Sequence, residues 1–130
     1  MALDDELAEV FDRGLRDGIA SLNPTDKQLF LIQYFICELE MNGLTGYFYN
    51  QLPALAHTHE TIAAMRVHGI NQLADLLAEA ASLFNGYCDP SPPTTWSAVL
   101  SKYDPSDSLS SITSRMHELP GYGFPESHEA

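Results

Sequence analysis

The side chains best suited to chemistry are those of the polar and aromatic residues around position 43. Glu38, Asn42, Tyr47 and Asn50 combine a carboxylate, two amides and a phenol within a short stretch of chain, and these groups can donate and accept hydrogen bonds. Glu38 and Glu40 are two residues apart, so on a helix they point in different directions and do not form a catalytic pair. We expect Glu38 to accept hydrogen bonds from N–H groups at the start of the next helical turn, a structural role. An enzyme or small-ligand site in this cluster is the alternative.

The other reactive residues of the sequence suggest less. His57 and His59 are two residues apart with Glu60 beside them, but no cysteine joins them and no His-Glu-x-x-His pattern occurs, so we interpret them as surface or capping residues rather than metal ligands. Cys37 has no basic residue or histidine near it in the sequence to favour a thiolate. Nucleotide-binding glycine patterns and a nucleophile elbow are absent from the sequence. The sequence therefore predicts no catalytic site, no metal and no cofactor.

The helix expected to carry Glu38 has a clear start and end. Asn23 can cap it and Pro24 suits its first position. Residues 29–41 are apolar around most of the circumference, which predicts a central, buried helix rather than a strand. Gly43 ends this helix. We expect a short helix or helical turn after it, with its aromatic side chains facing inward: Tyr47, Phe48 and Tyr49.

Apolar residues at helical spacing predict the remaining elements. Thr58 is expected to cap one helix and Asp107 another, with a break at Gly69. The predicted helical stretches are residues 3–20, 58–68, 70–84, 96–103 and 107–119. The side chains expected to face inward in the first and third of the long helices are Leu3, Leu7, Val10, Phe11, Leu15, Ile19, Ile62, Ala63 and Met65. We expect a stiff loop at 88–95 and a mobile tail at about 121–130.

Composition and charge set the class of protein. The chain has 130 residues, 45% of them hydrophobic, with 6 Lys and Arg against 18 Asp and Glu, a net charge of −12. We predict one all-α domain over residues 1–130, a compact bundle of about five to seven helices with no substantial sheet. The acidic start lacks the features of a signal peptide, and the longest apolar run is too short for a membrane span, so a cytoplasmic protein is expected.

The sign of the charge bears on partners. A net negative charge repels nucleic acid and anionic membranes, and it favours basic proteins, including those whose surfaces hold DNA. Acidity that only keeps the protein soluble is the plainer interpretation. The sequence thus predicts no direct nucleic-acid binding and no membrane binding, and it leaves a homodimer open.

The segment of residues 38–50, here called the signature segment, resembles the signature of the DUF4375 family, whose members include DNA-mimic proteins of the DMP19 type. Aligned without gaps, five positions match that pattern: Glu38, Gly43, Tyr47, Phe48 and Asn50. The departures from it are at Glu40, Met41, Asn42, Leu44 and Gly46. The resemblance covers about residues 22–115. It implies an all-α fold in which the five matching residues are structural.

For some members the resemblance also implies a surface whose carboxylates stand where DNA phosphates would. Carboxylates three or four residues apart on a helix are neighbours on one face. Two such rows occur here, Asp5, Glu9 and Asp12 in the first, Asp75 and Glu79 in the second. We therefore predict a small acidic protein-binding module, a DNA mimic that occupies the DNA-binding face of a basic partner such as a transcription factor. An immunity-type accessory protein is a further alternative.

Overall fold

The structure, a computed structural model, describes residues 3–51, 55–84 and 96–123. In this part of the chain every regular element is helical and no strand occurs, which confirms the predicted all-α fold. The α-helices are α1 (Leu3–Asp17), α2 (Pro24–Gln51), α3 (Ala56–Val67), α4 (Asn71–Ser82), α5 (Trp96–Tyr103) and α6 (Ser108–His117). Two short 3-10 segments are η1 (Ile19–Ser21) and η2 (Pro120–Gly123). None of the helices in these ranges is long and apolar enough to cross a bilayer.

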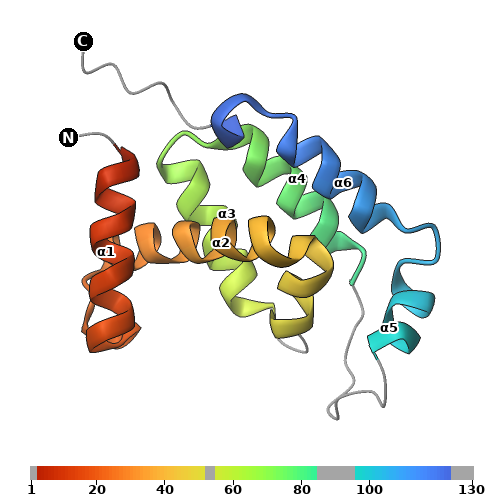
Figure 1. The fold of residues 1–130 in the computed structure, drawn as a ribbon, viewed down its shortest axis with the longest axis horizontal. Coiled ribbons are helices and arrows are strands. Elements are labelled where there is room, and N and C mark those ends of the chain that lie inside the picture. The colour runs from red at the N-terminus through yellow and green to blue at the C-terminus, as the bar shows by residue number, and fades with distance from the viewer. Residues whose placement is uncertain (1–2, 52–54, 85–95, 124–130) are drawn as a thin grey trace.

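Helix α2 is the centre of the fold. It runs through the middle of the molecule in Figure 1, and α1, α3 and α6 all pack against it, while α4 packs against α3 and α6. Its buried side chains lie on several sides of the helix, as its nearly continuous apolar sequence predicts: Leu29, Phe30, Leu31, Ile32, Phe35, Ile36, Leu39, Leu44, Tyr47 and Phe48. The prediction of a central, buried helix is confirmed.

A kink at Gly43 divides α2 into two helical segments. Gly43 has φ 68° and ψ −175°, a backbone conformation that is essentially restricted to glycine. The segment after the kink buries Tyr47 and Phe48 as expected. Tyr49, however, is 62% exposed, so the expectation that all three aromatic residues face inward is wrong. One helix cannot turn three consecutive residues to the same side, and Tyr49 instead forms a T-shaped contact with Trp96 of α5, with ring centroids 5.6 Å apart.

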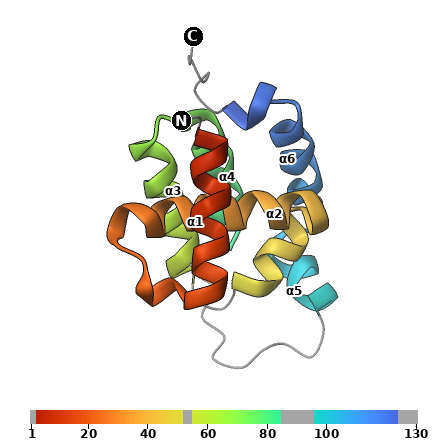
Figure 2. The same cartoon turned by 60° about the vertical axis from the view of Figure 1, so that its left-hand side comes forward.

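Helix α1 crosses the first segment of α2 (Figure 2). Val10 is buried and Phe11 stacks on Phe30 of α2, with ring centroids 5.2 Å apart. Gly14 lies so close to Phe30 that a Cβ at this position would overlap the aromatic ring. Leu15 is 64% exposed, which corrects its predicted inward position, because the contact with α2 runs through Val10 and Gly14. The side chains of Leu3, Leu7 and Ile19 lie outside the described ones.

The helix starts agree with the predicted caps at one position and differ at two. Asn23 Oδ1 accepts a hydrogen bond from the backbone N–H of Asp26 at 2.8 Å, which confirms the cap of α2. Thr58 does not cap α3, because the helix begins before it and Thr58 is fully buried. Its hydroxyl is the partner of Tyr47, with the two oxygens 3.1 Å apart. A buried phenol needs such a partner, and this need decides the role of Thr58.

The start of α6 is capped by Asp104 and not by the predicted Asp107. Asp107 adopts a left-handed conformation (φ 56°) and makes no capping hydrogen bond. Instead, the buried Asp104 accepts from the N–H groups of Ser108 at 2.6 Å and Leu109 at 3.0 Å. The turn through Pro105 places Asp104 below the free N–H groups of the helix, so the predicted cap at Asp107 is wrong.

Three further predictions concern the break at Gly69, the inward face of α3 and the C-terminal tail. The predicted break at Gly69 is confirmed, with α3 ending at Val67 and α4 beginning at Asn71. On α3, Met65 is buried and Ile62 half-buried, but Ala63 is exposed, contrary to expectation. Tyr122 in η2 donates from its hydroxyl to Glu40 at 3.1 Å, so the chain is still anchored beyond residue 121. The predicted loop at 88–95 and the rest of the tail, 124–130, lie outside the described residues.

Candidate functional site

Glu38 is the centre of a hydrogen-bonded cluster beside the kink. Its Oε1 accepts from Asn42 Nδ2 at 2.8 Å, and its Oε2 accepts from the Tyr34 hydroxyl at 3.2 Å and from Asn50 Nδ2 at 3.0 Å. Three neutral donors thus hold one half-buried carboxylate. We call Tyr34, Glu38, Asn42 and Asn50 the Glu38 cluster. Because Asn50 belongs to the second segment of α2, the cluster ties the two segments together.

The expected partners of Glu38 were different. Sequence reasoning assigned it the backbone N–H groups that follow the break, but the N–H of Leu44 is instead hydrogen-bonded to Thr113 Oγ1 at 3.2 Å. Thr113 lies on α6, far along the chain, and its hydroxyl donates in turn to the carbonyl of Leu109 at 2.7 Å. The expected role of Glu38 toward these N–H groups is therefore wrong. A contact between residues so distant in sequence leaves no local signal.

Tyr47 does not join Glu38, although the alternative site placed them together. Its side chain is 1% exposed and its hydroxyl lies against Thr58. Burial raises the pKa of Tyr47 to about 12. The ring meets Phe35 and Phe48 edge-on, with centroid distances of 4.9 and 5.2 Å. Tyr47 therefore ties the second segment of α2 to the core and to α3.

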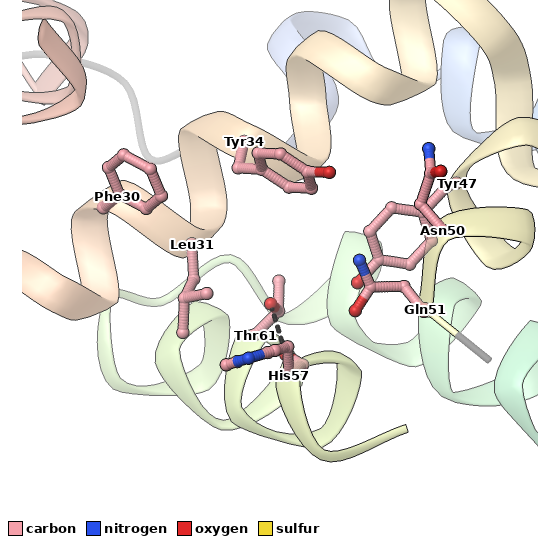
Figure 3. Close-up of a pocket in the computed structure, with 8 residues that line it drawn as sticks. All are labelled: Phe30, Leu31, Tyr34, Tyr47, Asn50, Gln51, His57 and Thr61. Atoms are coloured by element: carbon pink, nitrogen blue, oxygen red, sulfur yellow. Dashed lines mark hydrogen bonds between the residues drawn. The ribbon is translucent and has the colours of Figure 1, made fainter. Parts of the chain in front are cut away.

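A cavity of about 290 Å³ lies between α2 and α3, beside the Glu38 cluster. Both segments of α2 contribute to its lining, and α3 closes the other side, as Figure 3 shows. The lining residues are Phe30, Leu31, Tyr34, Tyr47, Asn50, Gln51, His57 and Thr61. The volume is just below the range of about 300–1,000 Å³ that is usual for ligand pockets. It suits one large side chain or a small molecule.

The two amide side chains of the cavity, those of Asn50 and Gln51, have defined orientations. Asn50 Nδ2 donates to Glu38 and also to the carbonyl of Gly46 at 3.3 Å. Both partners are acceptors, so the orientation of the Asn50 amide is fixed and its Oδ1 is left as an acceptor. Figure 3 shows the amide of Gln51 pointing into the space between Tyr34 and Thr61. The cavity thus combines an aromatic wall with amide groups.

The acidic row on α4 is paired with arginines from neighbouring elements. Asp75 accepts from Arg66 of α3 at 2.9 Å, and Glu79 accepts from Arg115 of α6 at 3.0 Å. All four side chains are exposed, and exposed pairs of this kind contribute about 0–1 kcal/mol each. The row lies on one face as predicted, but each of its carboxylates has a cation beside it.

The acidic row on α1 differs in its partners. Glu9 forms a pair with Arg13 at 3.1 Å, and Arg13 also reaches Asp26 of α2 at 2.9 Å. The hydrogen bond that Arg13 donates to Glu9 is the main cause that raises the pKa of Arg13. Asp12 is exposed, and among the described residues it has no partner. The side chain of Asp5 lies outside the described ones.

Most of the few cations are already engaged within the fold. Five of the six Lys and Arg side chains form ion pairs with carboxylates: Arg13, Arg16, Lys27, Arg66 and Arg115. The sixth, Lys102, lies over the ring of Tyr103, with Nζ 5.2 Å from the centroid. Among the described carboxylates that form no ion pair, those of Asp12, Glu40, Asp107 and Glu118 are exposed, with little basic surface to offset them.

The histidines singled out from the sequence are surface residues here. His57 Nδ1 lies 3.1 Å from Glu60 Oε1, and His59 is exposed. Glu60 is also bonded to Lys27 at 3.1 Å, and this contact is the largest cause that lowers the pKa of Glu60. In the described ranges, no group of three or more His, Cys, Asp and Glu side chains is placed to hold a metal ion.

Of the eight residues that line the cavity, only Tyr47 and Asn50 belonged to the cluster expected from the sequence, and those that were missed include Tyr34, Gln51 and Thr61. Tyr34 precedes Glu38 by four residues, so a contact between them could have been predicted from helical spacing. Gln51 and Thr61 line the same cavity because the kink returns the chain over α3. Gly43 predicted the break, but the sequence holds no local signal of the direction of that return.

The fold and the charge define an acidic, all-α protein built around one kinked central helix. The model of the DMP19-like protein family matches residues 20–125, and the chain belongs to this family. No curated protein and no solved structure gives a significant match to the chain.

Proposed function

We propose that this protein is a binding module that presents carboxylates to the DNA-binding face of a basic partner protein, in the manner of a DNA mimic. The observation that carries the proposal is the charge distribution: a net charge of −12, with five of six cations already paired inside the fold. Membership of the DMP19-like family supports it, since DNA mimics are among the proteins that the sequence resembles.

The physical basis is competition for the same cations. A DNA-binding face gains affinity by neutralising a row of phosphates, and a row of carboxylates on a helix offers comparable charge. The rows on α1 and α4 are the surfaces we propose for this contact. The arginine pairs of α4 do not prevent it, because exposed pairs contribute only about 0–1 kcal/mol and open at low cost.

The test is displacement of DNA from a partner. Proteins captured from the native host at low salt are purified, and each is loaded with its labelled DNA duplex. We expect this protein to displace the duplex from at least one of them, with an affinity that falls steeply as salt rises. A partner that binds this protein and its DNA together, or an affinity that salt leaves unchanged, would contradict the proposal.

Charge-neutralising double variants locate the face. Asp5→Asn with Asp12→Asn removes two charges from α1, and Asp75→Asn with Glu79→Gln removes two from α4. Asp107→Asn with Glu118→Gln removes two exposed charges elsewhere and serves as the matched control. We expect the α1 or the α4 variant to weaken binding by about tenfold more than the control, equivalent to about 1.4 kcal/mol. Equal effects of all three would reject both rows as the contact surface.

A further inference from the structure

We propose that the cavity between α2 and α3 receives an arginine side chain of the partner, with its guanidinium held near Glu38, Asn50 and Gln51. The inference rests on the proposed function, because it assumes that the partner is a basic protein. It goes beyond that function in naming a site that is not part of either acidic row. A single buried arginine at such a site would be an anchor of the interface.

The shape of the cavity fits a long side chain with a flat end. Phe30 and Tyr34 lie along one wall with nearly parallel rings, 19° apart in plane and 6.5 Å between centroids. Leu31 and Thr61 lie across from these rings (Figure 3). The aliphatic part of an arginine can pack against the apolar wall, and its planar guanidinium can stack on the face of Tyr34.

The negative charge of Glu38, next to the cavity, favours a cation. Glu38 is not itself a lining residue, but its carboxylate accepts hydrogen bonds from two residues that are, Tyr34 and Asn50. All its donors in the described ranges are neutral, so its negative charge is not compensated as those of Asp75 and Glu79 are. A carboxylate offers about four acceptor positions, and the three bonds leave one. Glu60, on the α3 side, is already bonded to Lys27 and His57.

The remaining acceptors favour arginine over lysine. Asn50 Oδ1 and the Gln51 amide oxygen have no partner within the described residues, and both belong to the lining. A guanidinium carries five N–H donors in one plane and can serve several acceptors at once. A lysine ammonium is a compact point charge that does not stack on an aromatic face in the same way.

The test uses small probes on the full-length protein, without any partner. The N-acetyl methylamides of arginine, lysine and citrulline are titrated while backbone and side-chain amide signals are followed by NMR. We expect saturable shifts at Asn50, Gln51 and Thr61 with the arginine probe, and a dissociation constant on the order of 1 mM for so small a ligand. The neutral citrulline probe should bind about tenfold more weakly or worse. Equal binding of citrulline, or of lysine, would overturn the assignment to arginine.

Substitutions of Gln51 give effects of opposite sign. Gln51→Lys places a competing cation in the cavity and should weaken the arginine probe by about tenfold or more, whereas Gln51→Glu should tighten it severalfold. Gln72→Lys and Gln72→Glu, at an exposed site on α4, make the same charge changes away from the cavity. If the Gln72 variants change probe binding as much as the Gln51 variants do, the probe senses only net charge and the proposed site is wrong.

The two proposals fail in different ways. Probe binding at the cavity together with no displacement of DNA by the protein would leave the arginine site standing and reject the DNA-mimic function. Displacement of DNA that Gln51→Lys leaves unchanged, with no saturable probe binding, would keep the function and reject the site.

Discussion

The signature segment and the acidic row on α4 both present carboxylates on a helix, but they use them differently. In the signature segment, Glu38 is half-buried and held by three neutral donors, so it joins two helical segments without a cation beside it. On α4, Asp75 and Glu79 are exposed and each pairs with an arginine of another helix. The comparison teaches that the number of carboxylates does not by itself give the electrostatic potential of a surface. The partner of each carboxylate decides how much of its negative charge is offset.

The largest effect expected in this comparison belongs to Tyr47 of the signature segment. Burial raises its pKa to about 12 from an ordinary value of 10.0. The folded protein therefore holds the proton more tightly, and the resulting stability is complete below about pH 10 and lost as pH rises toward 12. The loss is on the order of 3 kcal/mol. Urea unfolding at several pH values between about 9 and 12 should show it, and Tyr47→Phe should flatten it. Identical alkaline slopes for the two proteins would show that another group is responsible.

Glu38→Gln tests the neutral donors of the signature segment. An amide cannot accept from all three donors, and it removes the charge that strengthens these bonds, so we expect a loss of about 1.5–3 kcal/mol in the free energy of unfolding. Denaturation in urea measures it. Because Glu38 and Tyr34 are half-buried while Asn42 and Asn50 are exposed, a part of the loss should persist in about 1 M NaCl. A loss below about 0.5 kcal/mol would mean that the cluster does not fasten the kink.

Gly43→Ala tests the backbone that the cluster fastens. The nearest atom to an added Cβ would be Thr113 Cγ2 at 3.8 Å, so there is space for it, and the cost is that of the backbone conformation, about 1–3 kcal/mol. Gly43→Asn should cost as much. At positive φ, asparagine tolerates only the left-handed helical region, and the ψ of that region differs from the ψ of Gly43. If Asn proves clearly milder than Ala in thermal unfolding, the chain at Gly43 has a different conformation.

The smallest effects are expected on α4. Asp75→Asn and Glu79→Gln should each change the free energy of unfolding by less than about 1 kcal/mol, since their ion pairs are exposed, and the change should shrink at high salt. Urea titrations at about 0.05 and 1 M NaCl measure both points. A loss as large as that of Glu38→Gln, or one that high salt does not reduce, would remove the distinction between the two regions.

Local signals in the sequence predicted much of the fold. The apolar stripes gave the helices, Asn23 was found as a cap, and Gly43 and Gly69 marked the breaks, because each of these depends on residues close together in the chain. Two of the errors arose where a residue of another helix intervened. Thr58 is taken up by the buried hydroxyl of Tyr47, and Leu15 is exposed because α1 approaches α2 through Gly14.

The candidate site was only partly visible in advance. Glu38, Asn42 and Asn50 were grouped correctly, since they meet around one break in one helix. The pairing of Asp75 with Arg66 and of Glu79 with Arg115 could not be predicted, because it depends on how α3 and α6 pack against α4. The cavity was missed because it depends on how α3 packs against the two segments of α2.

The kink at Gly43 has a consequence for how binding could be lost. From Tyr34 to Asn50 a straight helix would advance about 24 Å, far beyond the reach of a shared carboxylate. The bend lets one helix supply two walls of a recess, although Gly43 is not among the residues that line it. A variant of Gly43 that keeps every lining side chain would therefore lack the recess. A comparison of related chains by their lining residues alone would overlook Gly43, on which the arrangement of those residues depends.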